Sequence, residues 1–419
     1  MFDLDKWQEI FYSLKQNKLR SFLTAFGVFW GIFMLIVMLG SGQGLQNGVT
    51  QGFGDFATNS VFIWAQRTTV EYKGFTKGRF FNYNNDDTRA IKQSVSGIKY
   101  LAPRLRGASF AGDNVIRGLN SGAFQILGDY PDMNLIDPVN IETGRFINNK
   151  DIEQKRKIVV IGTRVQESLF DPDENPIGEY IRIQGVYFKV VGIFSSKKSG
   201  EQADRDNQAI FMPFTTLQKT YNYGDIVGVY AITAEDHISV SKIEDEVIKI
   251  LKQRHKIAPE DDQAIGHFNV EKEFKQMRGV FMGIDGLIWV VGIGTLLAGV
   301  IGVSNIMLVI VKERTKEIGI QRAIGATPAK IVSQIITESV FLTSFAGYIG
   351  LVIGIGLIEL VNFALIKFEV ESNMFRNPEV NFQIAITALI ILIITGAFAG
   401  FVPAKRAINV KPIDALRSE

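Results

Sequence analysis

Four long apolar runs limit what this chain can fold into. A run of about 18 or more apolar residues is typical of a helix that spans a membrane. Such runs occupy residues 22–40, about 283–311, about 335–366 and 382–402 of the 419. The remaining sequence is mixed in polarity, so the 47% hydrophobic content describes a protein that is partly embedded in a membrane and partly exposed to water.

The second and third runs are longer than one bilayer crossing requires. About 30 residues at 1.5 Å per residue give roughly 45 Å, against a hydrocarbon core of about 30 Å. We therefore expect these two helices to project beyond the bilayer or to tilt strongly.

Lys and Arg residues predict the orientation of the chain. They cluster before the first run, between the second and third, and after the fourth, whereas the loop at 367–381 has more Glu than Lys and Arg. By the positive-inside rule, both termini and residues 312–334 are cytoplasmic, and residues 42–278 lie outside. A cleaved signal peptide is the alternative for the first run, but the run reaches spanning length and no small-x-small cleavage site follows it. The clustered basic residues are Lys15, Lys18, Arg20, Lys312, Arg314, Lys316, Arg322, Lys330, Lys405, Arg406, Lys411 and Arg417.

Residues 1–20 predict a helix with one apolar face. Such a helix can lie on the cytoplasmic surface of the membrane with Trp7 near the headgroups, or it can pack against the spanning helices. The apolar positions are Phe2, Leu4, Trp7, Ile10, Phe11 and Leu14.

The outer segment predicts a mixed α/β domain. Gln184 and Gly185 between two β-rich stretches predict a hairpin of residues 180–183 and 186–193. The helix at 86–95 begins with Asp86 as its expected cap. The simplest arrangement is one α/β part built from both ends of the segment, with a β-rich part inserted from about 115 to 217. Further strands are expected at 59–65, 99–107 and 227–233, and a further helix at 239–255.

No stretch of the sequence predicts a catalytic or metal site. The nearest approach to a phosphate-binding loop, residues 74–79, lacks its spacing and its Ser or Thr. The three histidines are scattered, and the absence of cysteine excludes disulfides, thiolate nucleophiles and Cys-ligated zinc. Charged residues in the spans, such as Asp285, Glu338 and Glu359, fall toward the span ends, so proton- or sodium-driven transport loses its usual sequence support. We expect neither catalytic residues nor a cofactor.

Glycines spaced four apart occur in three of the apolar runs. The pairs Gly27/Gly31, Gly350/Gly354 and Gly396/Gly400 can mark close contacts between helices within one chain or a dimer interface. The pattern is weak, and general helix packing is the preferred interpretation.

A charged stretch at 311–334, "VKERTKEIGIQRAIGATPAKIVSQ", separates the second and third apolar runs. It predicts a short amphipathic helix with Ile318, Ile320 and Ile324 as apolar anchors. Gly325 predicts the end of that helix, and Thr327 with Pro328 the start of the next. One interpretation is that these charges serve topology and solubility alone. Any positively charged loop would meet those needs, whereas this stretch combines charge, isoleucines and the start of a second helix in a fixed order.

These residues resemble the MacB/FtsX-type family of ABC transporter permeases. The resemblance rests first on "ERTKEIGIQRAIGATPAKI" at 313–331, which is similar to the family's cytoplasmic signature. It extends to "NKLRSFLTAFGVFWGI" at 17–32 and "PAKRAINVKPIDALR" at 403–417. Residues 143–147, 159–194 and 209–218 are similar to the MacB-type periplasmic core, so the match covers nearly the whole chain.

The resemblance implies an α-helical membrane protein with four transmembrane helices and a large α+β periplasmic core domain. In that domain a porter-like α/β part carries an inserted β-rich part. The expected divisions are 1–20 cytoplasmic helix, 21–41 first span, 42–278 periplasmic core, 279–311 second span with stalk, 312–334 cytoplasmic coupling segment, 335–366 third span, 367–381 short periplasmic loop, 382–402 fourth span and 403–419 cytoplasmic tail.

In this family the cytoplasmic signature docks on an ABC ATPase. The chain itself begins almost at the permease, so the resemblance leads us to expect the ATPase as a separate polypeptide and no enzymatic activity here. A homodimer, or a dimer with a related permease, is also implied. The residues expected to couple to the ATPase are Glu313, Arg314, Glu317, Ile318, Gly319, Arg322, Gly325 and Ala326.

Three functions are compatible with this family resemblance. The first is MacB-like export of small amphiphilic or peptide-like substrates from the periplasm of a bacterial inner membrane, with a periplasmic adaptor and an outer-membrane channel. The second is FtsX-like activation of cell-wall hydrolases, and the third is lipoprotein release. The large outer segment favours the first, and a structural membrane protein without transport is the weakest alternative.

Overall fold

The computed structural model describes residues 18–52, 57–107, 112–198, 200–368, 375–380 and 382–409. The amphipathic helix expected at 1–20 and the end of the tail expected at 403–419 lie largely outside these residues. The chain divides into two compact units, one formed by residues 50–279 and the other by the segments on either side.

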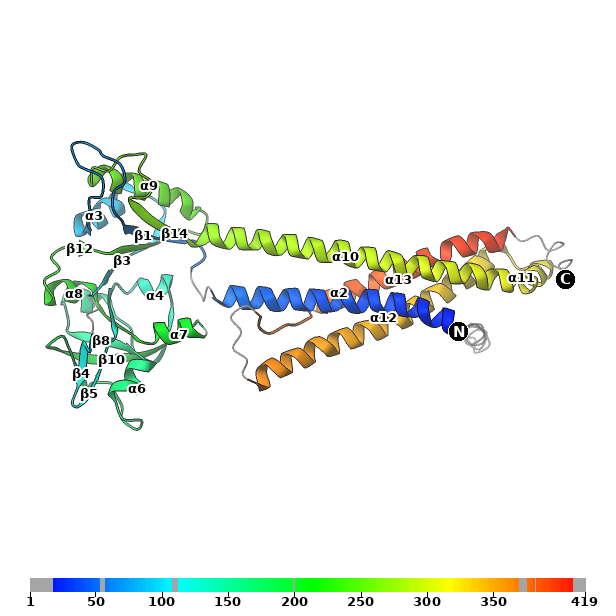
Figure 1. Ribbon diagram of the computed structural model, residues 1–419, viewed down its shortest axis with the longest axis horizontal. Coiled ribbons are helices and arrows are strands. Elements are labelled where there is room, and N and C mark those ends of the chain that lie inside the picture. The colour runs from blue at the N-terminus through cyan, green and yellow to red at the C-terminus, as the bar shows by residue number, and fades with distance from the viewer. Residues whose placement is uncertain are drawn as a thin grey trace. The chain divides into compact units, whose positions relative to one another are not determined.

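The flanking segments form a helical unit. Four of its helices are long and apolar enough to cross a membrane, with candidate spans at Ala25–Thr50, Val270–Glu313, Pro328–Lys367 and Phe382–Ile408. This confirms the expected fold class of four spanning helices beside a mixed α/β domain, and the second and third helices are longer than one crossing, as predicted. The helices are α2 (Lys18–Gly52), α10 (Val270–Glu313), α11 (Thr315–Ala323), α12 (Pro328–Lys367) and α13 (Phe382–Ile408) (Figure 1).

Small residues let these helices approach one another closely. A Cβ atom on Gly350 of α12 would lie 2.5 Å from the Phe29 carbonyl oxygen of α2. One on Gly396 of α13 would lie 2.9 Å from the Val340 Cα of α12. The glycine pairs in α12 and α13 therefore serve packing within the chain, which is the preferred interpretation of the sequence. Above and below these contacts, Ile32, Leu35 and Ile36 of α2 belong to one apolar core shared by all four long helices.

Residues 50–279 form a mixed α/β unit around a twelve-stranded sheet. The strand order is β14-β1-β13-β3-β6-β11-β8-β10-β9-β4-β5, with β7 paired to β10, and β12 and β2 form a separate pair. The strands are β1 (Ser60–Ala65), β2 (Tyr83–Asn84), β3 (Ile98–Arg106), β4 (Val115–Arg117), β5 (Asn120–Gly122), β6 (Gln125–Asp129), β7 (Val139–Gly144), β8 (Ile158–Gly162), β9 (Tyr180–Ile183), β10 (Val186–Ser196), β11 (Ala209–Pro213), β12 (Ile226–Val227), β13 (Val229–Ala234) and β14 (Ile265–Asn269). The helices are α3 (Asn85–Ser94), α4 (Met133–Ile136), α5 (Asn149–Glu153), α6 (Thr163–Leu169), α7 (Glu201–Asp206), α8 (Phe214–Thr220) and α9 (Val240–Arg254).

Strand β3 joins the two parts of this sheet. Its residues from Ile98 to Arg104 pair with β13, and its last residues, Leu105 and Arg106, pair with β6. Elements from both parts contribute to a single apolar core. At the junction, Arg104 donates to both oxygens of the buried Asp129 at 2.7 and 2.8 Å, so this carboxylate is matched by a bidentate partner.

The hairpin predicted at residues 180–193 is confirmed, whereas the predicted cap of α3 is wrong. Strands β9 and β10 pair antiparallel, and Gln184 and Gly185 both have positive φ, as a tight two-residue turn requires. The cap of α3 is Asn84 rather than Asp86. Asn84 has extended backbone angles and accepts from the Asp87 amide, while the Asp87 carboxylate accepts from the Asn84 amide, and this reciprocal pair fixes the start of the helix.

Helices α3 and α9 pack together on one side of the sheet (Figure 1). The buried Asp87 carboxylate accepts from His255 Nε2 at 2.7 Å and from Arg254 Nε, both at the end of α9. Burial opposes its ionisation, but these hydrogen bonds outweigh burial and lower the pKa of Asp87 below its usual value. The start of α3 is thereby tied to the end of α9.

Candidate functional site

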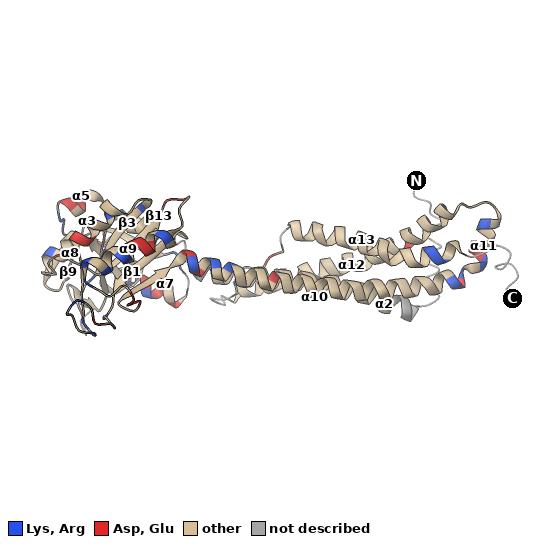
Figure 2. Cartoon of the chain, turned by 90° about the horizontal axis from the view of Figure 1, so that it is seen from above, with Lys and Arg blue, Asp and Glu red and all other residues tan. Residues whose placement is uncertain are grey.

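The charged stretch between α10 and α12 is the candidate site. Within the helical unit, Lys, Arg, Asp and Glu gather near α11, whereas most of α12 and α13 carries none (Figure 2). Helix α10 ends at Glu313, and α11 follows after the single residue Arg314. The Arg314 amide donates to the Ile310 carbonyl of α10 at 2.9 Å, and the Ile318 amide donates to the Arg314 carbonyl at 3.0 Å, so helical hydrogen bonds continue across the one-residue break.

Arg314 binds α11 to α12. Its Nε lies 3.0 Å from Glu317 Oε2 on α11, and its Nη1 lies 3.1 Å from Glu338 Oε1 on α12. The Glu338 side chain is 11% exposed and that of Arg314 is 18% exposed, whereas that of Glu317 is 62% exposed. The inner pair is shielded from water, so removing either partner would leave an unpaired buried charge and should cost more than breaking an exposed ion pair.

Arg322 binds α11 to α13. Its Nη1 donates to the carbonyl of Ile408, the last residue of α13, at 2.6 Å. A cation at the C-terminus of a helix satisfies an orphan carbonyl and complements the helix dipole. The coupling segment is thus attached by side chains to the two helices that follow it in the sequence.

The inner face of α11 is apolar and closely packed. Ile318 and Gly319 are buried against Ile310 of α10 and Ile331 and Ile335 of α12. The cavity beneath α11 has a volume of about 20 Å³, which is about the space of one water molecule. This cavity is too small for a nucleotide or a substrate.

The outer surface of α11 differs from the sequence prediction. Ile318 is the only one of the three expected apolar anchors that is buried, since Ile320 is 42% and Ile324 83% exposed. Successive helical residues are rotated by about 100°, so Ile320 lies on the face opposite Ile318, and Ile324 lies beyond the last helical residue. The two exposed isoleucines are flanked by Lys316 and Glu317, which are also exposed.

A Schellman motif ends α11. The Ala326 amide donates to the Gln321 carbonyl at 2.9 Å, and the Gly325 amide donates to the Arg322 carbonyl at 3.1 Å. Gly325 has φ +104°, which explains the glycine, and α12 begins at Pro328 as predicted. Thr327 is at the expected cap position, but its side chain makes no capping hydrogen bond.

The structure separates the eight expected coupling residues into three groups. Glu313 and Glu317 are exposed; Arg314, Ile318, Gly319 and Arg322 face the neighbouring helices; Gly325 and Ala326 form the turn. Sequence reasoning missed the partners Glu338 and the Ile408 carbonyl. A carboxylate inside an apolar run is itself a sign of a buried partner, so Glu338 could have been found in this way.

The three histidines belong to different parts of the mixed α/β unit. His237, His255 and His267 each lie beside a different carboxylate, Glu235, Asp87 and Glu244 respectively. Among the described residues, no group of three or more His, Asp or Glu side chains is arranged to hold a metal ion.

Comparisons with known proteins agree with this architecture. The family model of the MacB-like periplasmic core domain matches residues 21–250, and that of the FtsX-like permease C-terminal domain matches residues 289–412. The periplasmic region of MacB from Actinobacillus actinomycetemcomitans, a crystal structure, aligns with a TM-score of 0.42 and 16% identity over 53% of this chain and 94% of that one.

Two relatives match nearly the full length of this chain. The macrolide export ATP-binding/permease protein MacB of Bdellovibrio bacteriovorus is 29% identical over 98% of this chain and 61% of its own length. The pyoverdine export ATP-binding/permease protein PvdT of Pseudomonas putida is 30% identical over 96% of this chain and 58% of its own length. The chain therefore spans about three-fifths of the length of these relatives. With the core-domain model matching more than half of its residues, the chain belongs to the MacB/FtsX-type family of ABC transporter permeases.

Proposed function

We propose that this chain is the permease part of an ABC exporter and that α11 docks on a partner ABC ATPase. One observation carries the proposal: Ile320 of α11 and Ile324 directly after it are exposed near the exposed Lys316 and Glu317, while the other face of α11 is fixed to the helical unit. Exposed large apolar groups rimmed by charge are typical of protein interfaces.

The attachments of α11 support a mechanical role. Arg314 and Arg322 join it to α12 and α13, and α10 runs without interruption for 44 residues, about 66 Å. A push on α11 by a closing ATPase would be carried along these helices to the extracytoplasmic domain. In this mechanism Glu313 and Glu317 contact the ATPase, Arg314, Ile318, Gly319 and Arg322 hold α11 in place, and Gly325 and Ala326 set the turn.

The proposed cargo is a small amphiphilic or peptide-like molecule. The two relatives described above have different substrates in their names, so neither substrate is transferred to this chain. The match to a MacB-type core domain supports export over FtsX-like activation of cell-wall hydrolases and over lipoprotein release. The proposed assembly contains two permease chains, identical or related, and reaches an adaptor and an outer-membrane channel.

The docking proposal is tested by charge placed on the apolar surface of α11. Tagged chain is recovered from its native membrane in mild detergent, and retained proteins are identified by mass spectrometry. The variant Ile324→Glu should retain about ten-fold less ABC ATPase, since central apolar residues dominate such interfaces. Lys405→Glu, an exposed residue on α13, is the control and should retain the wild-type amount. Equal recovery with both variants would refute docking through α11.

The same experiment distinguishes the alternative functions. Recovery of an adaptor or an outer-membrane channel beside the ATPase agrees with export. A cell-wall hydrolase or a lipoprotein carrier in their place would support the FtsX-like or the lipoprotein-releasing function.

The proposed topology, with both termini and α11 in the cytoplasm, can be tested by labelling. The chain contains no cysteine, so single cysteines give clean signals. Leu119, which is fully exposed on the mixed α/β unit, should react as Leu119→Cys with an impermeant maleimide added to intact cells. Lys316→Cys on α11 should react only after the membrane is opened, and the reverse pattern would overturn the orientation.

A further inference from the structure

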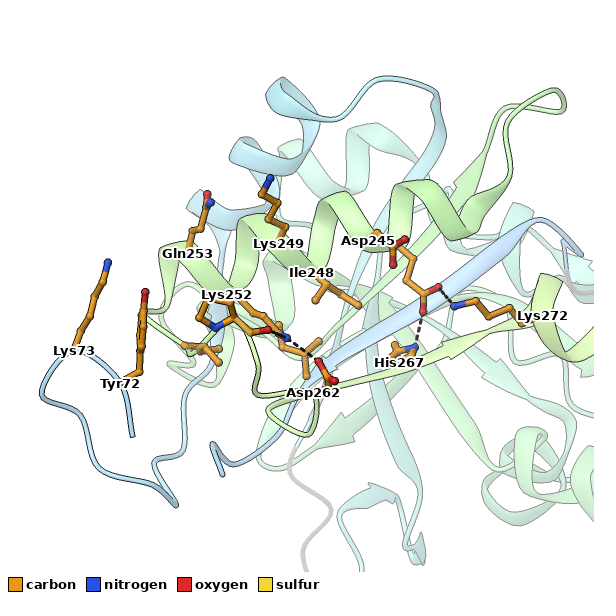
Figure 3. Close-up of a pocket in the computed structure, with 14 residues that line it drawn as sticks. Tyr72, Lys73, Asp245, Ile248, Lys249, Lys252, Gln253, Asp262, His267 and Lys272 are labelled. Atoms are coloured by element: carbon orange, nitrogen blue, oxygen red, sulfur yellow. Dashed lines mark hydrogen bonds and ion pairs between the residues drawn. The ribbon is translucent and has the colours of Figure 1, made fainter. Parts of the chain in front are cut away.

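A pocket of about 470 Å³ lies on the mixed α/β unit beside α9 (Figure 3). Its walls come from α9, from β14 and the loop before it, from the first turn of α10, and from the loop that carries Tyr72 and Lys73. Its volume is in the range of pockets that hold small molecules, about 300–1,000 Å³. None of its residues belongs to the coupling segment.

The pocket has an apolar floor. Ile257 and Ile265 are buried in the core of the unit, and Ile248 of α9 is half-buried beside them. The ring of Tyr72 stands at one side of the opening, opposite α9 (Figure 3). Ile257 and Ile265 are each only 2% exposed, so Ile248 and the Tyr72 ring supply most of the apolar surface on which a short hydrocarbon chain or ring can be removed from water.

The loop that carries Tyr72 is held in place before any ligand binds. The buried Asp261 carboxylate accepts from the Thr69 amide and hydroxyl, both at 2.7 Å, and from the Val70 amide at 3.1 Å. Tyr72 and Phe75 exchange two backbone hydrogen bonds at 3.0 and 3.1 Å. A preformed wall lowers the entropic cost of binding.

Two acidic residues of the pocket are already neutralised. Glu244 is 1% exposed, and its Oε2 accepts from Lys272 Nζ at 3.0 Å and Asn269 Nδ2 at 2.6 Å, while His267 contacts Oε1. Asp262 accepts from Lys252 Nζ at 3.1 Å, and the same ammonium donates to the Pro259 carbonyl. Glu244 is therefore closed to a cationic ligand, whereas Asp262 is 93% exposed and is paired with Lys252 on one side only.

The charge that remains at the mouth is positive. Lys249 of α9 has no ion pair within the part of the chain that the structure describes, and Lys73 has only the Tyr72 ring, 5.3 Å from its Nζ. Asp245 is the one lining acid left to oppose them among the described residues. Tyr72 and Lys73 stand on the loop at one side of the opening, and Lys249 and Gln253 stand on α9 at the other side (Figure 3), so an anionic group at the opening would lie between two positively charged sides.

We propose that this pocket binds a small amphiphile with one anionic group. Its apolar part lies on Ile248, Ile257 and Ile265, and its anionic head lies between Lys73 and Lys249. The volume of about 470 Å³ is typical of pockets that bind small molecules, and the site does not depend on docking of an ATPase to α11.

The test uses the full chain in phosphatidylcholine nanodiscs and a photoreactive probe, dodecanoate with a diazirine in its chain. Cross-linked peptides are mapped by mass spectrometry, with the matching alcohol and amine as probes of different charge. The carboxylate should label peptides that contain Ile248 and Ile265, and the alcohol and the amine should label them less. The double variant Lys73→Glu/Lys249→Glu should lower this labelling about ten-fold.

Two control variants separate binding from misfolding. Lys150→Glu/Lys219→Glu makes the same charge change at exposed positions on α5 and α8, and labelling should be unchanged. Ile248→Trp should fill the pocket and abolish labelling by all three probes. Equal labelling by carboxylate, alcohol and amine, or labelling that survives the Lys73/Lys249 reversal, would overturn the proposal.

Competition distinguishes the source of the anion. Loss of labelling when phosphatidylglycerol is added to the nanodisc would assign the site to a membrane lipid. Loss only with free decanoate would assign it to a soluble amphiphile. Both results support the same recognition chemistry, and failure of both competitors would count against it.

Discussion

The two units of this chain bury polar groups in different ways. In the mixed α/β unit, the carboxylates of Asp87, Asp129 and Glu244 are buried, and each accepts from an Arg, His, Lys or Asn side chain. In the helical unit, the buried positions of α12 and α13 are held by Ile, Leu, Ala, Gly, Ser and Thr, apart from Pro403. Among the described residues, the ion pair of Arg314 with Glu338 joins the start of α11 to α12.

This difference follows from the surroundings of each unit. A carboxylate inside a water-exposed domain needs one matched partner to remain charged. A helix inside a bilayer gains no hydrophobic free energy from contact with another helix, so close approach of backbones has to supply the attraction. The two units should therefore fail through different kinds of mutation.

The largest effect is expected from closing a helix contact. Gly350→Leu places side-chain atoms against the backbone of Phe29, which cannot move aside, so the cost should be about 3 kcal/mol or more. Size-exclusion chromatography of the detergent-solubilised protein should show loss of the monodisperse peak. Gly356→Leu is the control on the same helix, because nothing lies within 4 Å of its Cβ position. Similar behaviour of both variants would show that α2 and α12 are not in close contact.

The next effect is the loss of a buried carboxylate. Asp87→Asn removes the charge that pairs with Arg254 and His255, and should destabilise the link between α3 and α9 by about 3 kcal/mol. Hydrogen exchange of the α3 and α9 amides in the full chain measures this local stability. Asp86→Asn, on the exposed side of the same turn, should change it by less than about 0.5 kcal/mol. An unprotected α3 in both variants would contradict the assigned role of Asp87.

Acid should also distinguish the two units. Burial opposes ionisation of Asp87, Asp151 and Asp261, but their hydrogen bonds and ion pairs lower each pKa below the usual value. Their contribution to stability is therefore complete above the unfolded pKa of about 3.9 and is lost as the pH falls through the lower folded values. Infrared melting in nanodiscs should show the sheet band weakening below about pH 4 before the helix band changes. A sheet band that melts independently of pH would remove this contrast.

The smallest effect concerns the ion pair of the helical unit. Arg314→Glu and Glu338→Arg should each destabilise the full chain, and the double exchange should recover about 1 kcal/mol of the combined loss. Thermal unfolding of the wild type, the two single variants and the double variant in nanodiscs gives the double-mutant cycle that measures this coupling. Strict additivity would mean that the pair does not hold α11 to α12.

Residues that act through local rules could be predicted from the sequence. Gln184 and Gly185 predict a hairpin turn, Gly325 and Pro328 predict a helix end and a helix start, and the apolar runs predict the spans, because each depends on neighbours in the chain. The cap of α3 was misplaced by two residues, since Asn84 and Asp86 are both good caps and only the backbone angles decide between them.

Contacts between distant residues could be predicted only in part, since a carboxylate inside an apolar run, such as Glu338, indicates a buried partner but not which residue it is. The sequence predicts Arg314 and Arg322 as coupling residues, and this stays a prediction, but it does not predict that their side chains reach Glu338 and the Ile408 carbonyl, 24 and 86 positions away. The pocket beside α9 depends on Tyr72 and Lys249, which meet only after the sheet has brought their elements together. No periodicity or spacing in the sequence records such a contact.

At the end of α11, two neighbouring residues are constrained for different reasons. Gly325 is constrained by the backbone of the Schellman motif, and Ile324 by the surface that it exposes. Gly325 has a left-handed backbone, so random substitution at this position should select for glycine, with asparagine the best replacement, whatever the partner protein is. Ile324 is exposed, so folding does not require a particular residue there. The residues that position 324 tolerates should instead depend on the surface of the partner protein. A saturation library over these two codons would therefore report on foldability at one position and on partner choice at the other.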